Sequence, residues 1–479
     1  MIRLLKLKVV LLAIISAVCI GIVRASKFEG IPDEALPTSS GYLTIDEAKG
    51  TKMFYVYYEA LSPPGKLSET PIVLWLQGGP GCSGLLGNFF ELGPWVIGAD
   101  QQFHPNPGSW NRIFGLLFLD NPVGTGFSIA PTEQDVPLNI EDVGEDLYTA
   151  LTAFYTENPS FQTRTLYATG ESYAGKYVPA LGYYYLQQQE KETPVFQLGG
   201  LAIGNGLTHP VAQIPAYAPA AYYMGLIDDR QRSKDEELAK LVVKHIENGR
   251  FDLAHDARSV LMRALYEQTG FATLLDIRRE LDYYTYANGS SWLSPVVNRE
   301  SIKKALGAEE SITWEDCTDY VDSSFRNQTM QSTKFMVEYA LTKLPVLLYQ
   351  GQFDLQDGVA SNEQWMKDIK WTGISEFWNT ERIVWQLEGV LAGHVRTYAN
   401  LSHVVIVGAG HLVPADQGLR SQKMVEAWIG GSLASSPSLS ASATPVKKSK
   451  TSCSVVDSFS IQSGKNLDMR VLEETPTSI

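Results

Sequence analysis

A serine in a short glycine-containing segment is the first candidate for chemistry in this sequence. Ser172 stands in the segment 170–175 (GESYAG), after an apolar run over 165–168 and before a helical pattern. The segment therefore predicts a strand, a sharp turn and a helix, the arrangement that exposes a nucleophilic hydroxyl at the top of a hydrolase sheet. Gly170 and Ala174 are small enough to leave that turn room. The segment is a weak signal by itself, because a plain surface turn has the same composition.

A serine hydroxyl becomes a strong nucleophile only when a histidine takes its proton. His411 follows an apolar run over 404–407 through Gly-Ala-Gly and precedes Pro414, which predicts a loop at the end of a strand. We therefore take His411 as the base and expect the other six histidines to be structural. They are His104, His209, His245, His255, His394 and His403.

The histidine needs a carboxylate that fixes its tautomer and favours its charged form. Asp354 follows the apolar run 345–349 through Gln-Gly-Gln-Phe, again at the carboxyl end of a predicted strand. Sheets of α/β proteins place their sites at that edge. Asp357, three residues further on, is the rival. The order Ser, Asp, His is that of α/β-hydrolases.

A glycine-rich segment supplies the backbone amides that acyl transfer requires. The segment 75–84 (WLQGGPGCSG) directly follows the predicted strand 71–76. A tetrahedral intermediate carries negative charge on one oxygen, and backbone N–H groups in such a segment can stabilise it. A phosphate-binding loop would need Gly-Lys-Ser/Thr or a strand-adjacent Gly-x-Gly-x-x-Gly, and neither is present.

The elements that position these residues alternate between strand and helix. Continuous apolar runs bounded by Gly, Pro or Asp are typical of strands covered on both faces. They cover 54–58, 71–76, 114–119, 165–168, 198–203, 345–349 and 404–407. Helical patterns over 140–155 and 176–189 lie between some of them. The sequence therefore predicts an α/β-hydrolase fold with a mostly parallel central sheet flanked by helices.

The predicted domain organisation has four parts. Residues 1–25 are a signal peptide, with a basic start, an apolar stretch over 9–23 and a cleavage site after Ala25. An uncleaved anchor is the competing interpretation. Residues 26–209 and 326–430 form the hydrolase core. Residues 210–325 form an inserted helical cap, with helical patterns such as 234–247 and 258–268. Residues 431–479, rich in Ser, Thr, Ala and Pro, form a flexible tail.

Composition excludes some classes of function. Among 479 residues, 39 are Lys or Arg and 53 are Asp or Glu, which gives a formal charge of −14. Such a charge repels phosphates, so the sequence argues against nucleic-acid partners and against a membrane-surface role. It contains no Cys-x-x-Cys or His-Glu-x-x-His pattern, and we expect no metal site and no cofactor.

Features of an exported protein occur along the chain. Asn288, Asn327 and Asn400 each begin a glycosylation sequon. Removal of the signal peptide leaves Cys82, Cys317 and Cys453, which allows one disulfide and one spare thiol in an oxidising compartment. We expect a secreted protein, or one delivered to a lysosome or vacuole, without a membrane anchor after cleavage.

Six segments in order resemble the signature blocks of the serine carboxypeptidase family. They are 75–83 (WLQGGPGCS), 90–94 (FELGP), 120–128 (DNPVGTGFS), 170–175 (GESYAG), 204–206 (GNG) and 410–414 (GHLVP). The resemblance covers about residues 41–428. Gln77 stands where Asn is commonest, and 350–354 (QGQFD) resembles the vitellogenic-like and retinoid-inducible branch.

The resemblance implies roles for individual residues. Ser172, Asp354 and His411 form the triad, and the amides of Gly79 and Tyr173 form the oxyanion hole. The positions that bind the free C-terminal carboxylate of the substrate match Trp75, Gln77, Glu91 and Glu171. The resemblance also pairs Cys82 with Cys317. The protein is then expected to remove C-terminal residues from peptides and proteins through an acyl-enzyme, with an acidic pH optimum.

Other functions remain in view at this point. An acyltransferase of the same fold would resolve the acyl-enzyme with an alcohol. Glu91 and Glu171 favour the peptidase, because carboxyl groups that bind a free C-terminus serve peptide substrates. A catalytically idle secreted scaffold is a third alternative, and the presence of all three triad residue types argues against it. A lipase-like esterase is disfavoured by acidic groups beside an apolar chain.

Overall fold

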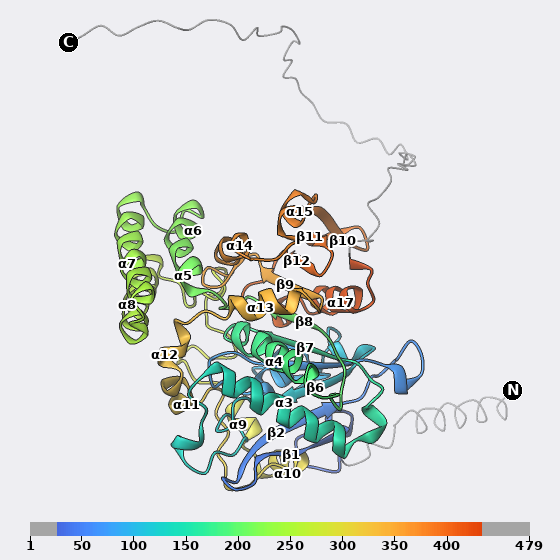
Figure 1. The fold of residues 1–479 in the computed structure, drawn as a ribbon. Helices are drawn as coiled ribbons and strands as arrows, with labels where there is room; N and C mark the ends of the chain where they lie inside the picture. Colours follow the sequence, from blue (N-terminus) through green and yellow to red (C-terminus); the bar gives the residue numbers. More distant parts are fainter. Residues whose placement is uncertain (1–25, 434–479) are drawn as a thin grey trace, which may run out of the picture. The chain divides into compact units, whose positions relative to one another are not determined.

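A ten-stranded sheet forms the centre of the protein (Figure 1). The structure is a computed structural model that describes residues 26–433. In spatial order the strands are β1 (Ser39–Asp46), β2 (Thr51–Tyr58), β6 (Gly115–Leu119), β3 (Ile72–Leu76), β7 (Leu166–Glu171), β8 (Leu198–Gly204), β9 (Val346–Gly351), β12 (Leu401–Ile406), β11 (Val390–Tyr398) and β10 (Ile383–Leu387). The strands from β6 to β12 in this order pair in parallel. The predicted mostly parallel sheet is confirmed.

The apolar runs form strands because both faces of the sheet are covered. Every residue of β3 and of β6 is buried. Successive side chains of a strand point to opposite faces, and in β2 Tyr55 and Tyr57 pack in one core cluster while Phe54 and Val56 pack in the other. Two hydrophobic cores therefore lie against one sheet.

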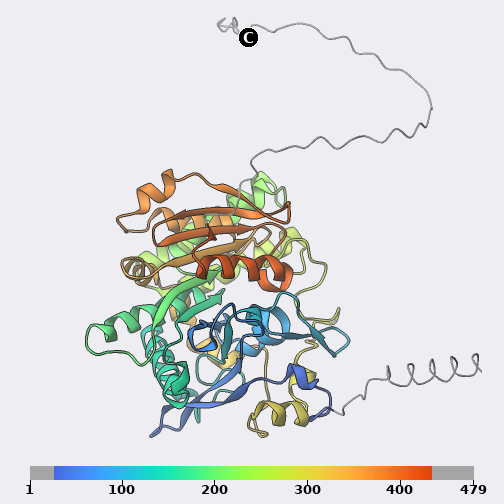
Figure 2. The same ribbon diagram turned by 90° about the vertical axis from the view of Figure 1, so that its right-hand side faces the viewer.

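Helices supply the outer layers of both cores (Figure 1 and Figure 2). One core includes apolar side chains of α3 (Ile140–Glu157), α4 (Ala174–Gln189) and α13 (Lys334–Leu341). The other includes Met424, Val425 and Trp428 of α17 (Gly418–Ile429). The Asn139 side chain accepts a hydrogen bond of 2.8 Å from the Asp142 N–H and so begins α3.

The sheet has antiparallel strands at both ends, which the sequence analysis did not predict. β1 pairs with β2, and β10 with β11, in antiparallel fashion. Only one of the eight residues of β1 and one of the five residues of β10 are buried. Half-exposed edge strands lack the continuous apolar runs that mark strands in the sheet centre. His403, one of the histidines expected to be structural, lies inside β12, and its Nε2 is 2.7 Å from Gln350 Oε1.

Every named element between β8 and β9 is a helix. The α-helices there are α5 (Pro210–Gln213), α6 (Tyr217–Tyr223), α7 (Asp229–Glu247), α8 (Phe251–Thr269), α9 (Ser294–Val297), α10 (Glu300–Leu306), α11 (Asp319–Ser324), α12 (Arg326–Thr329) and α13. The helices α7 and α8 lie side by side (Figure 1). A capping box at Asp228 begins α7, and Gly270, with a φ of 69°, ends α8.

The remaining elements are short. Beside several single-turn 3-10 helices, they are the strands β4 (Trp95–Ile97) and β5 (Phe103–Pro105), the helices α2 (Gly84–Leu86), α14 (Val359–Lys367), α15 (Ile374–Asn379) and α16 (Val413–Asp416), and the π-helix η3 (Gly87–Leu92).

The predicted signal peptide and almost all of the predicted tail lie outside residues 26–433. Leu433, inside the predicted tail, is 3% exposed and packs in the core with α17, so ordered packing extends past residue 431. Within the described residues, none of the helices combines the length and the apolar character needed to cross a bilayer.

Candidate active site

Ser172 occupies a sharp turn between β7 and α4. Its φ is 61°, a left-handed value that residues other than glycine seldom adopt. The Ser172 N–H donates to Gly204 O at 3.0 Å, and its carbonyl accepts from Leu207 N at 2.9 Å. A Cβ at Gly170 would stand 2.5 Å from Leu76 O, so only glycine fits there. The turn is therefore held tightly by its neighbours, and its backbone strain is of the kind found at functional sites.

His411 and Asp354 form a buried pair. His411 Nδ1 is 2.7 Å from Asp354 Oδ2, and their side chains are 3% and 0% exposed. Burial disfavours the charged imidazolium, but the charge of Asp354 and its hydrogen bond raise the pKa of His411 above 6.5. With Nδ1 facing the carboxylate, Nε2 is the nitrogen left to accept a proton.

Three further donors hold the Asp354 carboxylate. Asn205 Nδ2 donates to Oδ2 at 2.7 Å, while the N–H groups of Gln356 and Asp357 donate to Oδ1 at 2.8 and 3.1 Å. Asn205 is itself fixed because its Oδ1 accepts from Gly351 N at 3.0 Å. The carboxylate thus has a partner on each oxygen and a single orientation.

The rival acid, Asp357, points elsewhere. Its Oδ2 accepts from Gln356 Nε2 at 3.0 Å, and within residues 26–433 it makes no hydrogen bond to His411. Burial, with the nearby charge of Asp354, raises the pKa of Asp357. The carboxylate that contacts the histidine is therefore that of Asp354.

Two backbone amides beside Ser172 are free to bind a ligand. The N–H groups of Gly79 and Tyr173 have no acceptor in the part of the chain that the structure describes. The loop after β3 approaches the serine closely, since a Cβ at Gly78 would lie 2.6 Å from Ser172 Cβ and 2.7 Å from Tyr173 N. Unbonded N–H groups at such a position are what an oxyanion hole requires.

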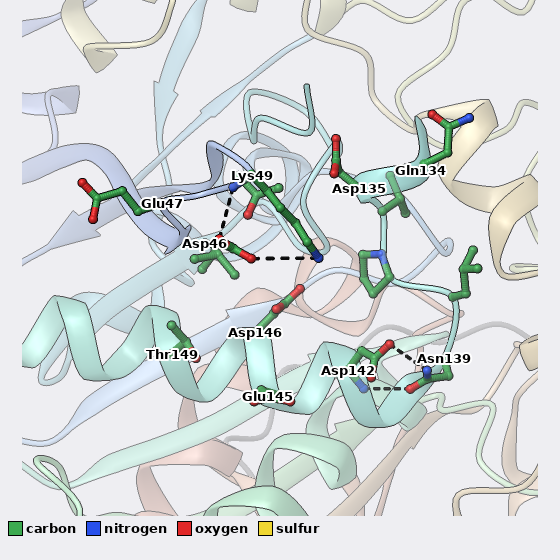
Figure 3. A pocket seen from close by; sticks show the side chains of 15 residues that line it. Asp46, Glu47, Lys49, Gln134, Asp135, Asn139, Asp142, Glu145, Asp146 and Thr149 are labelled. Atoms are coloured by element: carbon green, nitrogen blue, oxygen red, sulfur yellow. Dashed lines mark hydrogen bonds and ion pairs between the residues drawn. The ribbon is translucent and has the colours of Figure 1, made fainter. Parts of the chain in front are cut away.

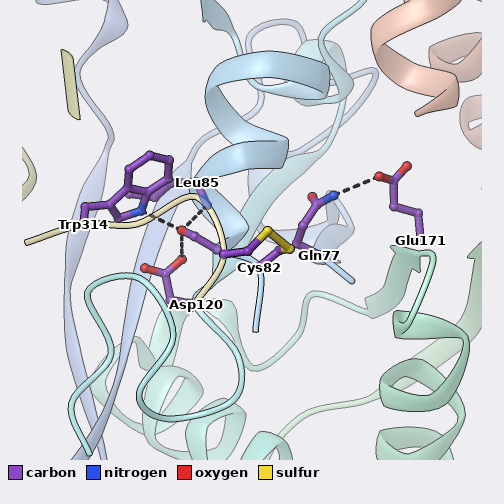
Figure 4. Close-up of a disulfide and its surroundings, with 8 residues drawn as sticks. Gln77, Cys82, Leu85, Asp120, Glu171 and Trp314 are labelled. Carbon is purple, nitrogen blue, oxygen red and sulfur yellow. Dashed lines mark hydrogen bonds between the residues drawn. A yellow bond between two sulfur atoms is a disulfide. The ribbon is translucent and has the colours of Figure 1, made fainter. Parts of the chain in front are cut away.

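A disulfide holds this loop to the helical segment, the part of the chain between β8 and β9 (Figure 4). Cys82 and Cys317 are bonded, as the family resemblance implied. Backbone hydrogen bonds flank the bridge, from Ser83 N to Asp316 O at 2.9 Å and from Thr318 N to Gly81 O at 2.8 Å.

Ser83 anchors the same loop to the core. Its hydroxyl donates to Asp120 Oδ1 and accepts from Trp314 Nε1 at 2.9 Å and from Leu85 N at 3.1 Å (Figure 4). The loop is therefore fixed on both sides of its cysteine.

Of the four predicted carboxylate-binding residues, two line the cavity at Ser172 and two do not. Gln77 and Glu171 line the same cavity as Ser172, and Gln77 Nε2 donates to Glu171 Oε1 at 2.8 Å. Trp75 lies behind them, with its Nε1 donating to Gln77 Oε1 at 2.8 Å. Glu91 is 2% exposed and is not part of that cavity wall. The structure thus brings the four together, but only Gln77 and Glu171 line the cavity at Ser172.

The two glutamates retain protons readily. Burial raises the pKa of Glu91 to about 8, although the nearby polar side chains of Gln77 and Glu171 oppose this rise. Burial and the charge of Glu91 raise the pKa of Glu171 well above its usual value. Both oxygens of Glu91 and Oε2 of Glu171 lack a partner within the described residues. Two neighbouring buried carboxyls of this kind share protons, and a protonated one can donate a hydrogen bond.

The cavity at Ser172 has a volume of about 280 Å³. Beside Ser172 and His411, its wall includes Tyr266, Tyr283 and Tyr284 from the helical segment. Leu86, Leu275 and Leu412 add apolar surface, while Asp282 and Gln356 add polar groups. Aromatic and apolar walls with a few convergent polar groups are typical of a binding site for one side chain.

A second hollow, of about 760 Å³, is lined mainly by acidic and polar side chains such as Asp46, Asp142 and Asp146 (Figure 3). It contains no serine, cysteine or histidine. Across residues 26–433, no three His, Cys, Asp or Glu side chains are grouped so that they could hold a metal ion.

The predicted glycosylation sites differ in exposure. Asn288 and Asn327 are exposed. Asn400 is partly buried and its Nδ2 donates to Leu341 O at 3.0 Å.

Several site residues were not predicted from the sequence. Asn205 belongs to a quoted signature segment, but nothing in the segment indicated that it would hold Asp354. Gln356, Tyr283 and Tyr284 carried no recognisable signal, because they reach the site through loops far apart in the chain. Of these residues, only Asn205 carried a usable signal, because it is a polar residue just past the end of a predicted strand.

The fold and the site together define a class. A serine on a strand-to-helix turn, a buried Asp–His pair and free backbone amides on a mostly parallel sheet are the features of an α/β-hydrolase. The sequence profile described as serine carboxypeptidase matches residues 30–431. The chain belongs to the serine carboxypeptidase family, and it is a serine-type carboxypeptidase.

Curated relatives and one solved structure agree with this assignment. "Serine carboxypeptidase-like 50" of Arabidopsis thaliana is 49% identical over 402 residues, which are 84% of this chain and 89% of that protein. "Venom serine carboxypeptidase" of Apis mellifera is 34% identical and covers 80% of this chain and 82% of its own. The crystal structure of Kex1Δp, a prohormone-processing carboxypeptidase from Saccharomyces cerevisiae, aligns with a TM-score of 0.74 at 23% identity, over 84% of this chain and 93% of that one. This last likeness supports the fold.

Proposed function

We propose that Ser172, His411 and Asp354 remove the C-terminal residue of a peptide. Ser172 Oγ attacks the last peptide carbonyl, and His411 Nε2 takes its proton. The N–H groups of Gly79 and Tyr173 bind the negative oxygen of the tetrahedral intermediate. His411 then gives the proton to the leaving amine, and the C-terminal amino acid departs. Water attacks the acyl-enzyme in the same way and regenerates Ser172.

The observation that carries this proposal is the carboxyl pair beside the nucleophile. Glu171 lines the cavity directly before Ser172 in sequence, and its Oε2 has no partner among the described residues. A protonated Glu171, with the Gln77 amide, would donate hydrogen bonds to the α-carboxylate of a substrate. Trp75 would fix Gln77, and Glu91 would share its proton with Glu171 from behind. Such a site selects a free C-terminus.

Two groups would bound the pH range of activity. His411 must be neutral to accept a proton, and its pKa is raised above 6.5, so turnover would fall as the medium becomes acidic. Ionisation of the carboxyl pair, with Glu91 at about 8, would weaken binding on the alkaline side. The optimum would lie between the pH at which His411 becomes neutral and the pH at which the carboxyl pair ionises.

The proposed cellular route is the secretory pathway, to the exterior or to a lysosome or vacuole. It is supported by the basic and apolar start of the sequence, by the Cys82–Cys317 disulfide and by the exposed sequons at Asn288 and Asn327. Peptide or protein C-termini are the proposed substrates.

Digestion of a peptide library, followed by mass spectrometry, tests the proposal. We expect losses confined to C-terminal residues, and none from the same peptides with amidated C-termini at low substrate concentration. The Ser172→Ala variant is the control for contaminating peptidases. Internal cleavage, or equal use of amidated peptides at every pH, would reject carboxylate recognition.

A further inference from the structure

A segment of the helical insertion lies across both loops that carry the Asp–His pair. We call residues 274–284, between α8 and α9, the strap. Leu355 N donates to Leu274 O at 3.0 Å, and His411 N donates to Leu275 O at 2.8 Å. The strap therefore bonds to the residue after the acid and to the base itself.

Arg278 lies at the point where the strap meets both loops. Its Nη1 donates to Gly408 O at 2.8 Å, three residues before His411. Its guanidinium carbon is 4.5 Å from the ring centre of Phe353, the residue before Asp354. Its Nη2 is 3.5 Å from Asp416 Oδ2, which in turn accepts from Gly410 N at 2.7 Å. One planar group thus contacts the loop of the acid and, on both sides of the base, the loop of the histidine.

The guanidinium is itself held in place. Asp276 binds it bidentately, with 2.8 Å from Nε to Oδ1 and 2.7 Å from Nη2 to Oδ2. The Asp276 side chain is 1% exposed and that of Arg278 is 37% exposed, so a buried carboxylate holds a partly exposed guanidinium. Fork-shaped pairing of this kind fixes orientation as well as distance.

We propose that Arg278 is a positioning residue for catalysis, which keeps Asp354 and His411 at hydrogen-bonding distance by joining their loops. The inference rests on the proposed triad. The two loops come from neighbouring strands, β9 and β12, but both extend beyond the last strand pairing, which is Ile406 with Gly351. Past that point Phe353 N still donates to Ala409 O at 2.8 Å, and the strap supplies the further links. A helical insertion would in this way complete the catalytic geometry of the sheet.

Lysine could not replace this residue fully. An ammonium is a point charge without a planar face, so it can pair with Asp276 but cannot also stack on Phe353 and reach Gly408 O. Glutamine would leave Asp276 buried without its cation, which destabilises the fold for a reason unrelated to catalysis. The double variant Asp276→Asn/Arg278→Gln removes that buried charge and isolates the positioning effect.

The test measures kcat and KM for a peptide with a free C-terminus, together with thermal stability. The matched control is Arg232→Gln. Arg232 also pairs with an acid, at 2.5 Å to Asp229 Oδ1, and also stacks on a ring, 4.3 Å from Tyr222, but it touches neither loop of the pair. We expect kcat to fall about 10- to 100-fold in Arg278→Gln and in the double variant, with KM nearly unchanged. Arg278→Lys should lie between these and the wild type, and the control should keep wild-type kcat.

A spectroscopic readout separates positioning from a general loss of structure. The proton on His411 Nδ1, bonded to Asp354, should give a low-field proton NMR signal in the wild type that is absent in His411→Ala. We expect this signal to persist in Arg232→Gln and to shift or broaden in the double variant. Wild-type kcat in a folded double variant would overturn the proposal. Substantial activity in Ser172→Ala would instead reject the triad, so the two failures are distinguishable.

Discussion

Two buried groups of titratable side chains lie beside Ser172, and they are built in opposite ways. In the first, a base faces an acid, His411 against Asp354, and each oxygen of Asp354 has protein donors. In the second, two acids are neighbours, Glu91 and Glu171, and three of their four oxygens have no partner within residues 26–433. The first group is complete without a substrate, and the second is not.

The difference teaches which group catalyses and which binds. A preorganised catalyst must not rearrange during the reaction, so its hydrogen bonds are made by the protein in advance. A binding group keeps unpaired polar atoms because a ligand will satisfy them, and like-charged neighbours keep the proton that an anionic ligand needs. Loss of the first group should therefore lower kcat, whereas loss of the second should raise KM.

The largest expected effect comes from the catalytic group. Ser172→Ala and His411→Ala should each lower kcat about 10⁶-fold, because neither residue works without the other. Hydrolysis of a C-terminally free peptide measures this, and circular dichroism checks that the variants fold. A double variant no worse than either single one is expected for residues that act as a unit.

Next in size is the exchange of the acid. Asp354→Asn should lower kcat about 10⁴-fold, because the amide favours the wrong tautomer of His411. Asp357→Asn is the matched control, since it is equally buried but makes no hydrogen bond to His411 within the described residues. A crippling Asp357→Asn with a mild Asp354→Asn would show that the wrong carboxylate has been assigned.

The carboxyl pair of Glu91 and Glu171 should make KM depend on pH. A raised pKa means that the glutamates are neutral at low pH and gain charge as pH rises toward about 8, the value for Glu91. The charged pair repels a substrate carboxylate, so KM should climb on the alkaline side. Glu171→Gln should weaken binding at low pH about 10-fold, as expected for one lost charge-assisted hydrogen bond, and flatten the rise of KM.

Two controls accompany this experiment. Peptides with amidated C-termini should show no comparable rise of KM with pH. Glu47→Gln, an exposed glutamate in the acidic hollow of Figure 3, should leave the profile unchanged. A wild-type KM that stays constant from about pH 6.5 to about 9.5, a range that spans the pKa of about 8 of Glu91, would remove the basis of the comparison.

The smallest expected effect concerns the disulfide that holds the oxyanion loop. Replacing Cys82 and Cys317 by alanine should lower the free energy of unfolding by about 2 to 4 kcal/mol. The loop keeps its anchors at Ser83, so kcat should fall only a few-fold and KM should hold. Thermal unfolding and steady-state kinetics measure the two effects. Peptide mapping without reduction should recover the Cys82–Cys317 pair, and a link from Cys82 to Cys453 would contradict the structure.

The sequence alone indicated the central strands of the sheet and the catalytic residues at the carboxyl ends of those strands. Continuous apolar runs predicted the buried strands because burial on both faces removes polar residues from them. The turn at Ser172 and the strand-end positions of His411 and Asp354 could be predicted because local backbone chemistry marks them. The edge strands β1 and β10 could not, since their half-exposed residues resemble loops.

Tertiary structure decided what depends on the meeting of distant segments. The choice between Asp354 and Asp357 follows from a distance of 2.7 Å to His411, which three residues of sequence separation cannot predict. The position of Glu91 in the carboxyl cluster follows from the packing of η3 against Trp75 and Gln77, since a Cβ at Gly87 would lie 2.2 Å from Trp75 Nε1. The contacts of Arg278 with two loops follow from the path of a strap more than 60 residues away from either. Sequence patterns report the environment of each residue along its own element, whereas a site assembled from several loops exists only once long-range packing has brought them together.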